Sequence, residues 1–179
     1  MRIIGGQFRG RVIRFPRADG LRPTPDRVRE TLFNWLGQDL VEQVTLDLYA
    51  GSGALTLEAL SRGAARAVAV DRDIACVRAI QETAAVFGAA GLEAHASDAR
   101  AYLSRETRKF DVIFLDPPFA ADEWPWLLPL CEARLAGGGF VYGEARRALE
   151  PPAPLETWRH AKAGHVHYHL FRRARGLKP

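Results

Sequence analysis

From residue 44 onward, short apolar runs alternate with segments of helical pattern, and this alternation is what most constrains the fold. Apolar runs predict strands over residues 44–49, 67–70, 93–96, 112–115, 140–143 and 165–171. Helical patterns fall between them at 54–62, 74–87, 99–105 and 124–135. Repeated strand–helix units predict an α/β fold built on a doubly wound, mostly parallel sheet.

The residues before this alternation predict a different local structure. Residues 1–20 place glycines between short apolar runs studded with arginine, which predicts a basic β-hairpin extension. Thr24 followed by Pro25 predicts a helix with Thr24 as its N-cap and Pro25 at its first position. At 179 residues and 47% hydrophobic, the chain fits one domain, with residues 21–179 as its core.

Charge is spread unevenly along the chain. Residues 1–30 carry a net charge of +5 and residues 171–179 carry +4, whereas the part between them carries −5. Basic ends around a mildly acidic body are typical of a protein that binds a polyanion such as nucleic acid. A solvated surface in a chain that prefers arginine is the alternative interpretation.

Four aspartates share one placement along the predicted sheet. Asp71, Asp98 and Asp116 directly follow predicted strands, and Asp47 lies near the end of another. The carboxyl ends of parallel strands line one crevice, where ligands bind in doubly wound folds. A single strand-terminal Asp is often only a helix N-cap, but four in succession predict a ligand site.

A glycine turn, Ala50-Gly51-Ser52-Gly53, follows the first strand of the alternation. It lacks both the dinucleotide fingerprint and the lysine of a phosphate loop, and the acid Asp47 beside it would repel a phosphate. Asp71 lies 24 residues after Asp47, near the spacing at which an acid takes ribose hydroxyls. Asp47, four residues before Gly51, favours a ligand with an ammonium group. A ribose, an amine and little phosphate together indicate S-adenosylmethionine.

The run Asp116-Pro117-Pro118-Phe119 ends the clearest predicted strand. Proline cannot donate to a sheet ladder, so the pair stops the strand and stiffens the loop. This leaves a carboxylate, rigid carbonyls and one aromatic ring, which can accept hydrogen bonds from a planar amino group while the ring stacks on its base. The run therefore indicates chemistry on the exocyclic nitrogen of a nucleobase.

These motifs resemble the class I methyltransferases, and in particular the bacterial 16S ribosomal RNA guanine-N2 methyltransferases of the RsmD type. The resemblance covers nearly the whole chain and is most specific before residue 35. Its blocks are Met1-Arg2-Ile3-Ile4-Gly5-Gly6, Leu21-Arg22-Pro23-Thr24, residues 27–34, residues 50–55, residues 57–63 and residues 116–119. Asp71 departs from the family, which commonly has Glu there, and the shorter side chain leaves the expected ribose contact intact.

The resemblance implies a Rossmann-like sheet of seven strands and transfer of a methyl group to N2 of a guanine, guanine 966 in the family's name. The expected catalytic residues are Asp116, Pro117, Pro118 and Phe119. The expected S-adenosylmethionine-binding residues are Asp47, Ala50, Gly51, Gly53, Asp71, Arg72, Asp98 and Ala99. The expected RNA-binding residues are Arg2, Arg9, Arg11, Arg14, Arg17, Arg22 and Thr24.

The expected partner is 16S ribosomal RNA, within a small subunit or its assembly intermediate, and a cytoplasmic monomer without a membrane segment is expected. No metal is expected, because His165, His167 and His169 on the last predicted strand have no nearby Cys or acid to complete a site. Two alternatives stay open from the residues alone. One is an adenine-N6 methyltransferase, which the same four-residue site would serve, and the other is a ribosome-assembly RNA-binding protein without catalysis.

Overall fold

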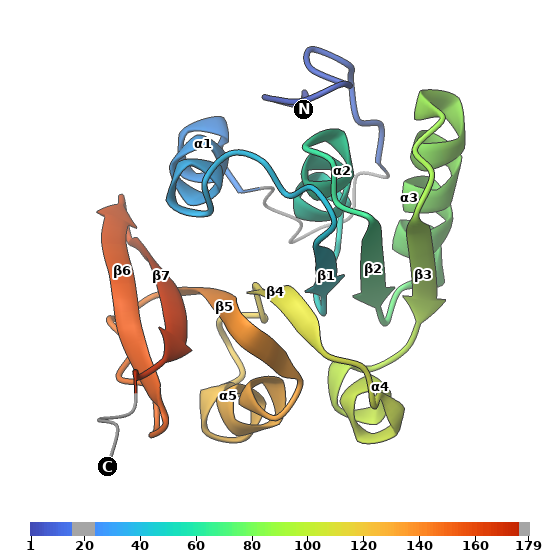
Figure 1. Cartoon of the computed structure of the whole chain (residues 1–179). Coiled ribbons are helices and arrows are strands. Elements are labelled where there is room, and N and C mark those ends of the chain that lie inside the picture. The colour runs from blue at the N-terminus through green and yellow to red at the C-terminus, as the bar shows by residue number, and fades with distance from the viewer. Residues whose placement is uncertain (16–23, 176–179) are drawn as a thin grey trace.

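A computed structural model describes residues 1–15 and 24–175, and it contains a seven-stranded sheet with helices on both faces (Figure 1). The strand order is β3-β2-β1-β4-β5-β7-β6. The strands are β1 (Val44–Asp47), β2 (Arg66–Asp71), β3 (Leu92–Ala96), β4 (Phe110–Leu115), β5 (Leu135–Ala145), β6 (Leu155–Ala163) and β7 (Val166–Arg173). The α/β class predicted from the strand–helix alternation is confirmed.

The first five strands are parallel, and the last two form an antiparallel hairpin against β5. The chain runs from β1 outward to β3 and then returns to place β4 on the other side of β1. The strand order therefore reverses between β1 and β4, which is where doubly wound sheets bind their ligands. The loops that leave β1 and β4 hold the glycine turn and the Asp116–Phe119 run.

Within the described residues, five helices cover the two faces of the sheet. They are α1 (Asp26–Trp35), α2 (Ala54–Ser61), α3 (Ile74–Phe87), α4 (Ala99–Arg105) and α5 (Trp124–Glu132). Figure 1 shows α1, α2 and α3 on one face and α4 and α5 on the other. The core follows this division, because Phe114 and Tyr142 pack with α1 and α2 whereas Ile113 and Leu115 pack with α4 and α5.

Two predictions from the sequence are wrong near the end of the chain. The strand predicted over residues 140–143 begins at Leu135, because Gly137-Gly138-Gly139 lies inside β5, where the register with β4 shifts. A bulge accommodates such a run because Gly138 adopts a φ of 77°, which glycine tolerates. The edge strand β6 was not located from the sequence, because its side chains are mostly polar and few are buried.

The start of α1 also differs from the prediction. The helix begins at Asp26 with Pro25 as its N-cap residue, and no side chain caps it. Thr24 does not serve as N-cap, because its hydroxyl donates to Oε1 of Glu144 at 2.8 Å. The Thr24 hydroxyl, which the local sequence pattern predicts to cap α1, is therefore bound instead to the carboxylate of Glu144, far away in the sequence.

The N-terminal segment, residues 1–15, is hairpin-like and packs against the domain. A single antiparallel bridge joins Arg2 to Val12, where a regular hairpin was expected. Buried Ile3, Phe8 and Ile13 pack on α2 and α3, so that α2 is buried along its whole length. The segment is thus part of the core rather than a separate arm.

A buried polar network fixes this segment in place. Oε2 and Oε1 of Glu58 accept the backbone N–H groups of Ile4 and Gly5 at 2.9 and 2.8 Å. The same carboxylate pairs with Arg62 at 2.9 Å and with Arg29 at 3.4 Å. The network joins the N-terminal segment, α1 and α2. Because Glu58 and Arg29 are fully buried, neither side chain can exchange these partners for water.

Candidate active site

The carboxyl ends of the parallel strands carry a row of acids. Asp47 ends β1, Asp71 ends β2, Asp98 follows β3 and Asp116 follows β4. Since β3, β2, β1 and β4 are consecutive neighbours in the sheet, all four side chains come to one edge. The structure thus places together the four aspartates that the sequence singled out.

Asp47 is the most buried of these acids, with 4% of its surface exposed. Thr56, on the first turn of α2, donates to its Oδ2 at 2.9 Å. The pKa of Asp47 is raised to about 7: burial is the main cause, the hydrogen bond from Thr56 opposes it, and the negative charge of Asp71 adds to the rise. A carboxyl group held this way becomes fully charged most readily when a cation lies beside it.

The glycine turn lies beside Asp47 and is tied to Asp71. Gly51 and Gly53 have positive φ angles of 49° and 77°. The N–H of Gly51 donates to Oδ2 of Asp71 at 2.8 Å. A Cβ on Gly53 would come within 2.6 Å of Cγ1 of Ile80, so a side chain here would push the turn away from α3. Ala50 before the turn is buried, and Arg72 after Asp71 is exposed.

Asp98 has a structural role that the site prediction did not assign to it. Its Oδ1 accepts the N–H of Ala101 at 3.0 Å and caps α4. The side chain is exposed, and the neighbouring Ala99 is buried against the sheet. Asp98 therefore combines a capping carboxylate with a position at the acidic edge.

The Asp116–Phe119 run leaves the end of β4, where sheet pairing with β5 continues to Leu115. Among the described residues the Asp116 carboxyl has no hydrogen-bond partner. Its pKa is raised well above the ordinary value, first by burial and then by the charges of Glu144 and Asp47. Phe119 is 43% exposed, which is unusual for so large an aromatic side chain.

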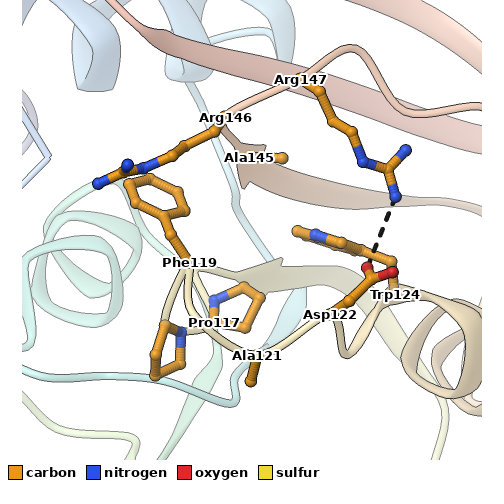
Figure 2. A pocket seen from close by; sticks show the side chains of 9 residues that line it. Pro117, Phe119, Ala121, Asp122, Trp124, Ala145, Arg146 and Arg147 are labelled. Atoms are coloured by element: carbon orange, nitrogen blue, oxygen red, sulfur yellow. Dashed lines mark ion pairs between the residues drawn. The ribbon is translucent and has the colours of Figure 1, made fainter.

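A cavity of about 300 Å³ opens against the outer side of this run (Figure 2). Pro117, Pro118 and Phe119 line it together with Trp124 of α5 and the residues that follow β5. Figure 2 shows Arg146 next to the ring of Phe119, with the guanidinium carbon 5.1 Å from the ring centre. An exposed aromatic ring under a guanidinium group suits a nucleic acid, which offers both bases and phosphates.

A fifth acid at the same edge was missed by the sequence analysis. Glu144 lies near the end of β5 and is 5% exposed. Burial raises its pKa, while hydrogen bonds from Thr24 and Tyr142 act in the opposite direction. The signal was present, because Glu144 directly follows the predicted strand 140–143 just as Asp71 and Asp116 follow theirs.

The predicted RNA-binding arginines fall into two groups. Arg9 and Arg14 are exposed, and neither side chain has a hydrogen bond or ion pair among the described residues. Arg2 donates to the carbonyl of Gly10 at 2.8 Å, and Arg11 donates to the carbonyls of Phe87 and Val86 at 3.0 and 2.8 Å. Arg17 and Arg22 lie outside the described residues.

The histidines near the C-terminus are arranged differently from the expectation. His167 and His169 of β7 stack with His160 of β6, whose ring centre is 5.1 Å from that of His167 and 4.5 Å from that of His169. His165 precedes the strand and does not join the stack. Within residues 1–15 and 24–175, no group of His, Cys, Asp or Glu side chains could hold a metal ion. In the same residues, no helix is long and apolar enough to cross a membrane.

Comparisons with known proteins agree with this geometry. A family model described as "Conserved hypothetical protein 95" matches residues 1–172. The ribosomal RNA small subunit methyltransferase D of Escherichia coli is 40% identical over 178 residues, which cover 97% of this chain and 90% of that protein.

Solved structures give the same result. A putative methyltransferase from Escherichia coli superposes with a TM-score of 0.88 at 40% identity, and 97% of each chain is covered. A putative methylase from Haemophilus influenzae superposes with a TM-score of 0.81 at 30% identity, covering 97% of this chain and 98% of that one. The matches span the N-terminal segment as well as the sheet.

Proposed function

Because this chain belongs to the RsmD-type family of ribosomal RNA methyltransferases, we propose that it transfers a methyl group from S-adenosylmethionine to N2 of one guanine in 16S ribosomal RNA. The observation that carries the proposal is the position of Asp116-Pro117-Pro118-Phe119. The run leaves the sheet at the point where the strand order reverses, between acids suited to a cation and a ring suited to a base.

The acidic edge fits S-adenosylmethionine by charge. Asp47 and Asp71 repel each other, and Asp47 lies buried with no cation beside it in the described part of the chain. A ligand with an ammonium group would relieve that repulsion at Asp47, and its ribose hydroxyls would reach Asp71. The backbone of the Ala50–Gly53 turn would bound the amino-acid end, with Arg72, Asp98 and Ala99 nearest the adenine. When bound, S-adenosylmethionine supplies a methyl group on a positively charged sulfur.

Asp116 and Pro117 would then prepare the amino group of the base. The N2 nitrogen of guanine is a poor nucleophile because its lone pair is conjugated with the ring. The Asp116 carboxylate and the Pro117 carbonyl would accept hydrogen bonds from its two N–H groups. These bonds favour a pyramidal nitrogen whose lone pair is aimed at the methyl group. The proton that N2 loses on methylation would pass to Asp116, whose raised pKa suits a proton acceptor.

Phe119 would stack on the target base, a contact worth about 1–3 kcal/mol per base. Pro118 stiffens the loop that carries the ring, so the base would be held in one orientation relative to the methyl group. Arg146 already covers the Phe119 ring and would shift to a neighbouring phosphate when the base arrives.

The arginine-rich front would bind the RNA backbone. Contacts from Arg2, Arg9, Arg11 and Arg14, together with Arg17 and Arg22, would supply affinity without choosing the sequence. We propose that a monomer acts in the cytoplasm, on 16S ribosomal RNA within a small subunit or its assembly intermediate. The fold of the RNA around one nucleotide would then decide which nucleotide reaches the site.

Product analysis tests the proposal directly. Small-subunit particles from a strain that lacks the enzyme are incubated with the purified chain and S-adenosylmethionine, and the modified nucleotide is mapped and identified. We expect N2-methylguanosine at one position. N6-methyladenosine would transfer the assignment to an adenine-N6 methyltransferase, and no methylation with intact RNA binding would indicate an assembly factor.

Substitution of Asp116 by Ala tests the role of the carboxylate. We expect the rate of methylation to fall at least about 100-fold, because a polar group aimed at the reacting centre is lost. Calorimetric titration should show that binding of S-adenosylmethionine is retained. The matched control is Asp39→Ala, an exposed acid away from the edge, which should methylate at the normal rate. Near-normal turnover by the Asp116 variant would refute the assignment.

A further inference from the structure

Glu144 lies beside Asp116 on the neighbouring strand. In the parallel pair of β4 and β5, Phe114 is in register with Tyr142 and Leu115 with Gly143. One residue further, Asp116 and Glu144 are therefore neighbours, and both side chains leave the sheet on the face of Phe114 and Tyr142. The charge of Glu144 is the strongest neighbouring influence that raises the pKa of Asp116, after burial itself.

One oxygen of Glu144 is held firmly by two hydroxyl groups. Thr24 donates to Oε1 at 2.8 Å and Tyr142 donates to the same atom at 2.9 Å. Thr24 precedes α1 and Tyr142 lies within β5, so two separate elements fix the carboxylate. The other oxygen, Oε2, accepts no hydrogen bond from residues 1–15 or 24–175, and Glu144 forms no ion pair with them.

The Glu144 side chain is fixed through Oε1, which leaves Oε2, within the described residues, free to accept a donor from a ligand. Its place beside Asp116 indicates where that donor comes from. If the amino group of a base lies at Asp116 and Pro117, the next polar position along the edge of the base faces the neighbouring strand. In guanine that position is the N1–H donor, whereas in adenine the corresponding ring nitrogen is an acceptor.

We propose that Oε2 of Glu144 accepts the N1–H of the target guanine and thereby selects guanine over adenine, a role that rests on the proposed transfer to N2. A guanine would give Glu144 its missing donor. An adenine would set a lone pair against the carboxylate and leave both groups unsatisfied. Sites built around a hydrogen bond reject analogues that lack it strongly, because the buried group is then left unpaired.

Base analogues at the mapped target position test this role. 2-Aminopurine keeps the amino group at C2 but has an acceptor at N1, and 6-thioguanine keeps N1–H while it loses the oxygen at C6. With the wild-type chain we expect kcat/KM for 2-aminopurine to be about 10- to 100-fold below that for guanine, the loss of one hydrogen bond to a charged group. The value for 6-thioguanine should stay close to that for guanine.

The substitution Glu144→Gln should reverse this preference. The amide oxygen of Gln would still accept from Thr24 and Tyr142, so its NH₂ group would face N1 of the base. We expect the variant to methylate RNA with 2-aminopurine faster than RNA with guanine. The variant Tyr142→Phe keeps the carboxylate and removes one of its donors, and it should therefore retain the preference for guanine.

The ratio of kcat/KM for the two substrates is compared between wild type and Glu144→Gln, because any difference in the intrinsic reactivity of the analogues then cancels. Equal ratios of kcat/KM for wild type and Glu144→Gln would overturn the proposal, as would wild-type discrimination below threefold if the variant does not fold. Titration with S-adenosylmethionine and a thermal melt show whether each variant is intact. Failure of the proposed function looks different, because the wild-type chain would then form no N2-methylguanosine even on RNA with guanine.

Discussion

At the scale of single residues, Asp47 combines two properties that oppose each other. Its burial makes the charged form unfavourable and raises its pKa to about 7. Its expected partner, the ammonium group of the cofactor, requires that charged form. Thr56 and the neighbouring helix hold the side chain in place, so the conflict cannot be relieved by rotation toward water.

Cofactor affinity should therefore depend on pH through Asp47. Below its pKa the carboxyl must lose a proton before the ammonium group binds, so affinity rises as the pH rises through 7 and then levels off. From pH 6 to pH 8 we expect about a tenfold gain in the association constant, measured by calorimetry. In the variant Asp47→Asn the affinity should be lower at both values and nearly independent of pH. A wild-type affinity that does not change over this range would contradict the assignment.

The same group affects stability in the opposite direction. A carboxyl whose pKa is higher in the folded chain than in the unfolded one loses stability as the pH rises from about 4 to about 7. The free energy of unfolding of Asp47→Asn should thus exceed that of the wild type at pH 8 when no cofactor is present. This is the pattern of a residue kept for binding rather than for folding.

Individual residues also show what the sequence could and could not predict about the site. The four aspartates are identifiable because each lies at or near the end of an apolar run, and a parallel sheet brings such positions to one edge. Glu144 has the same placement, directly after the predicted strand 140–143, but the pattern of strand-terminal aspartates does not include it. The bond from Thr24 to Glu144 joins positions 120 residues apart, and no local pattern predicts such a partner.

At the scale of elements, the N-terminal segment both builds the core and carries the basic surface. Arg11 illustrates the first role, because it binds the last carbonyls of α3 and its guanidinium carbon lies 4.3 Å from the ring centre of Phe87. A cation at this end of a helix is favoured by the helix dipole. Arg9 contributes only to the basic surface, since its side chain is exposed and unpaired within the described residues.

Substitutions of these two arginines should separate the roles. Arg11→Ala should lower the free energy of unfolding by about 1 kcal/mol, through the lost helix-end and cation–π contacts. Arg9→Ala should leave that free energy within about 0.5 kcal/mol of the wild type and weaken RNA binding instead. Urea unfolding and RNA titration on both variants check this. A loss of stability in the Arg9 variant equal to that of Arg11 would show that the two side chains do not differ as described.

The element-scale prediction from sequence was good where strands are buried and poor where they are not. The interior strands β2 and β4 are mostly apolar runs, as expected in a sheet covered on both faces. The edge strand β6 alternates without a strong apolar face, and the glycine run in β5 imitates a turn. Both errors arise because pairing with a neighbouring strand, not local composition, decides the conformation.

At the scale of the whole molecule, the basic ends of the chain and the acidic edge of the sheet act in opposite ways on the phosphates of RNA. The net charges of +5 over residues 1–30 and +4 over residues 171–179 attract phosphates, while the acids at the sheet edge repel them. RNA backbone would be held away from the acidic edge, and only an uncharged base would enter it. Binding of RNA should therefore depend strongly on salt concentration, and binding of S-adenosylmethionine only weakly.

RNA affinity should fall steeply with salt. If about five phosphates are neutralised by arginines, the association constant should drop about 100-fold between 50 and 200 mM salt, as counterions are no longer released so favourably. The binding of S-adenosylmethionine, measured in the same buffers, should change by much less because its expected charge contacts lie in a partly buried edge. A salt response of RNA binding as shallow as that of the cofactor would argue against the arginine-rich surface.

The packing of residues 1–15 against α2 and α3 also decides when their apolar cluster can form during synthesis of the chain. Ile3, Phe8 and Ile13 leave the ribosome before either helix, and Phe87, on which this cluster closes, emerges more than seventy residues after Ile13. Until then these apolar side chains can cover only the part of the cluster that α2 supplies, Ala54 and Leu57, and Arg11 has no helix end to bind. Residues 1–15 are thus synthesised well before the last side chains on which they pack.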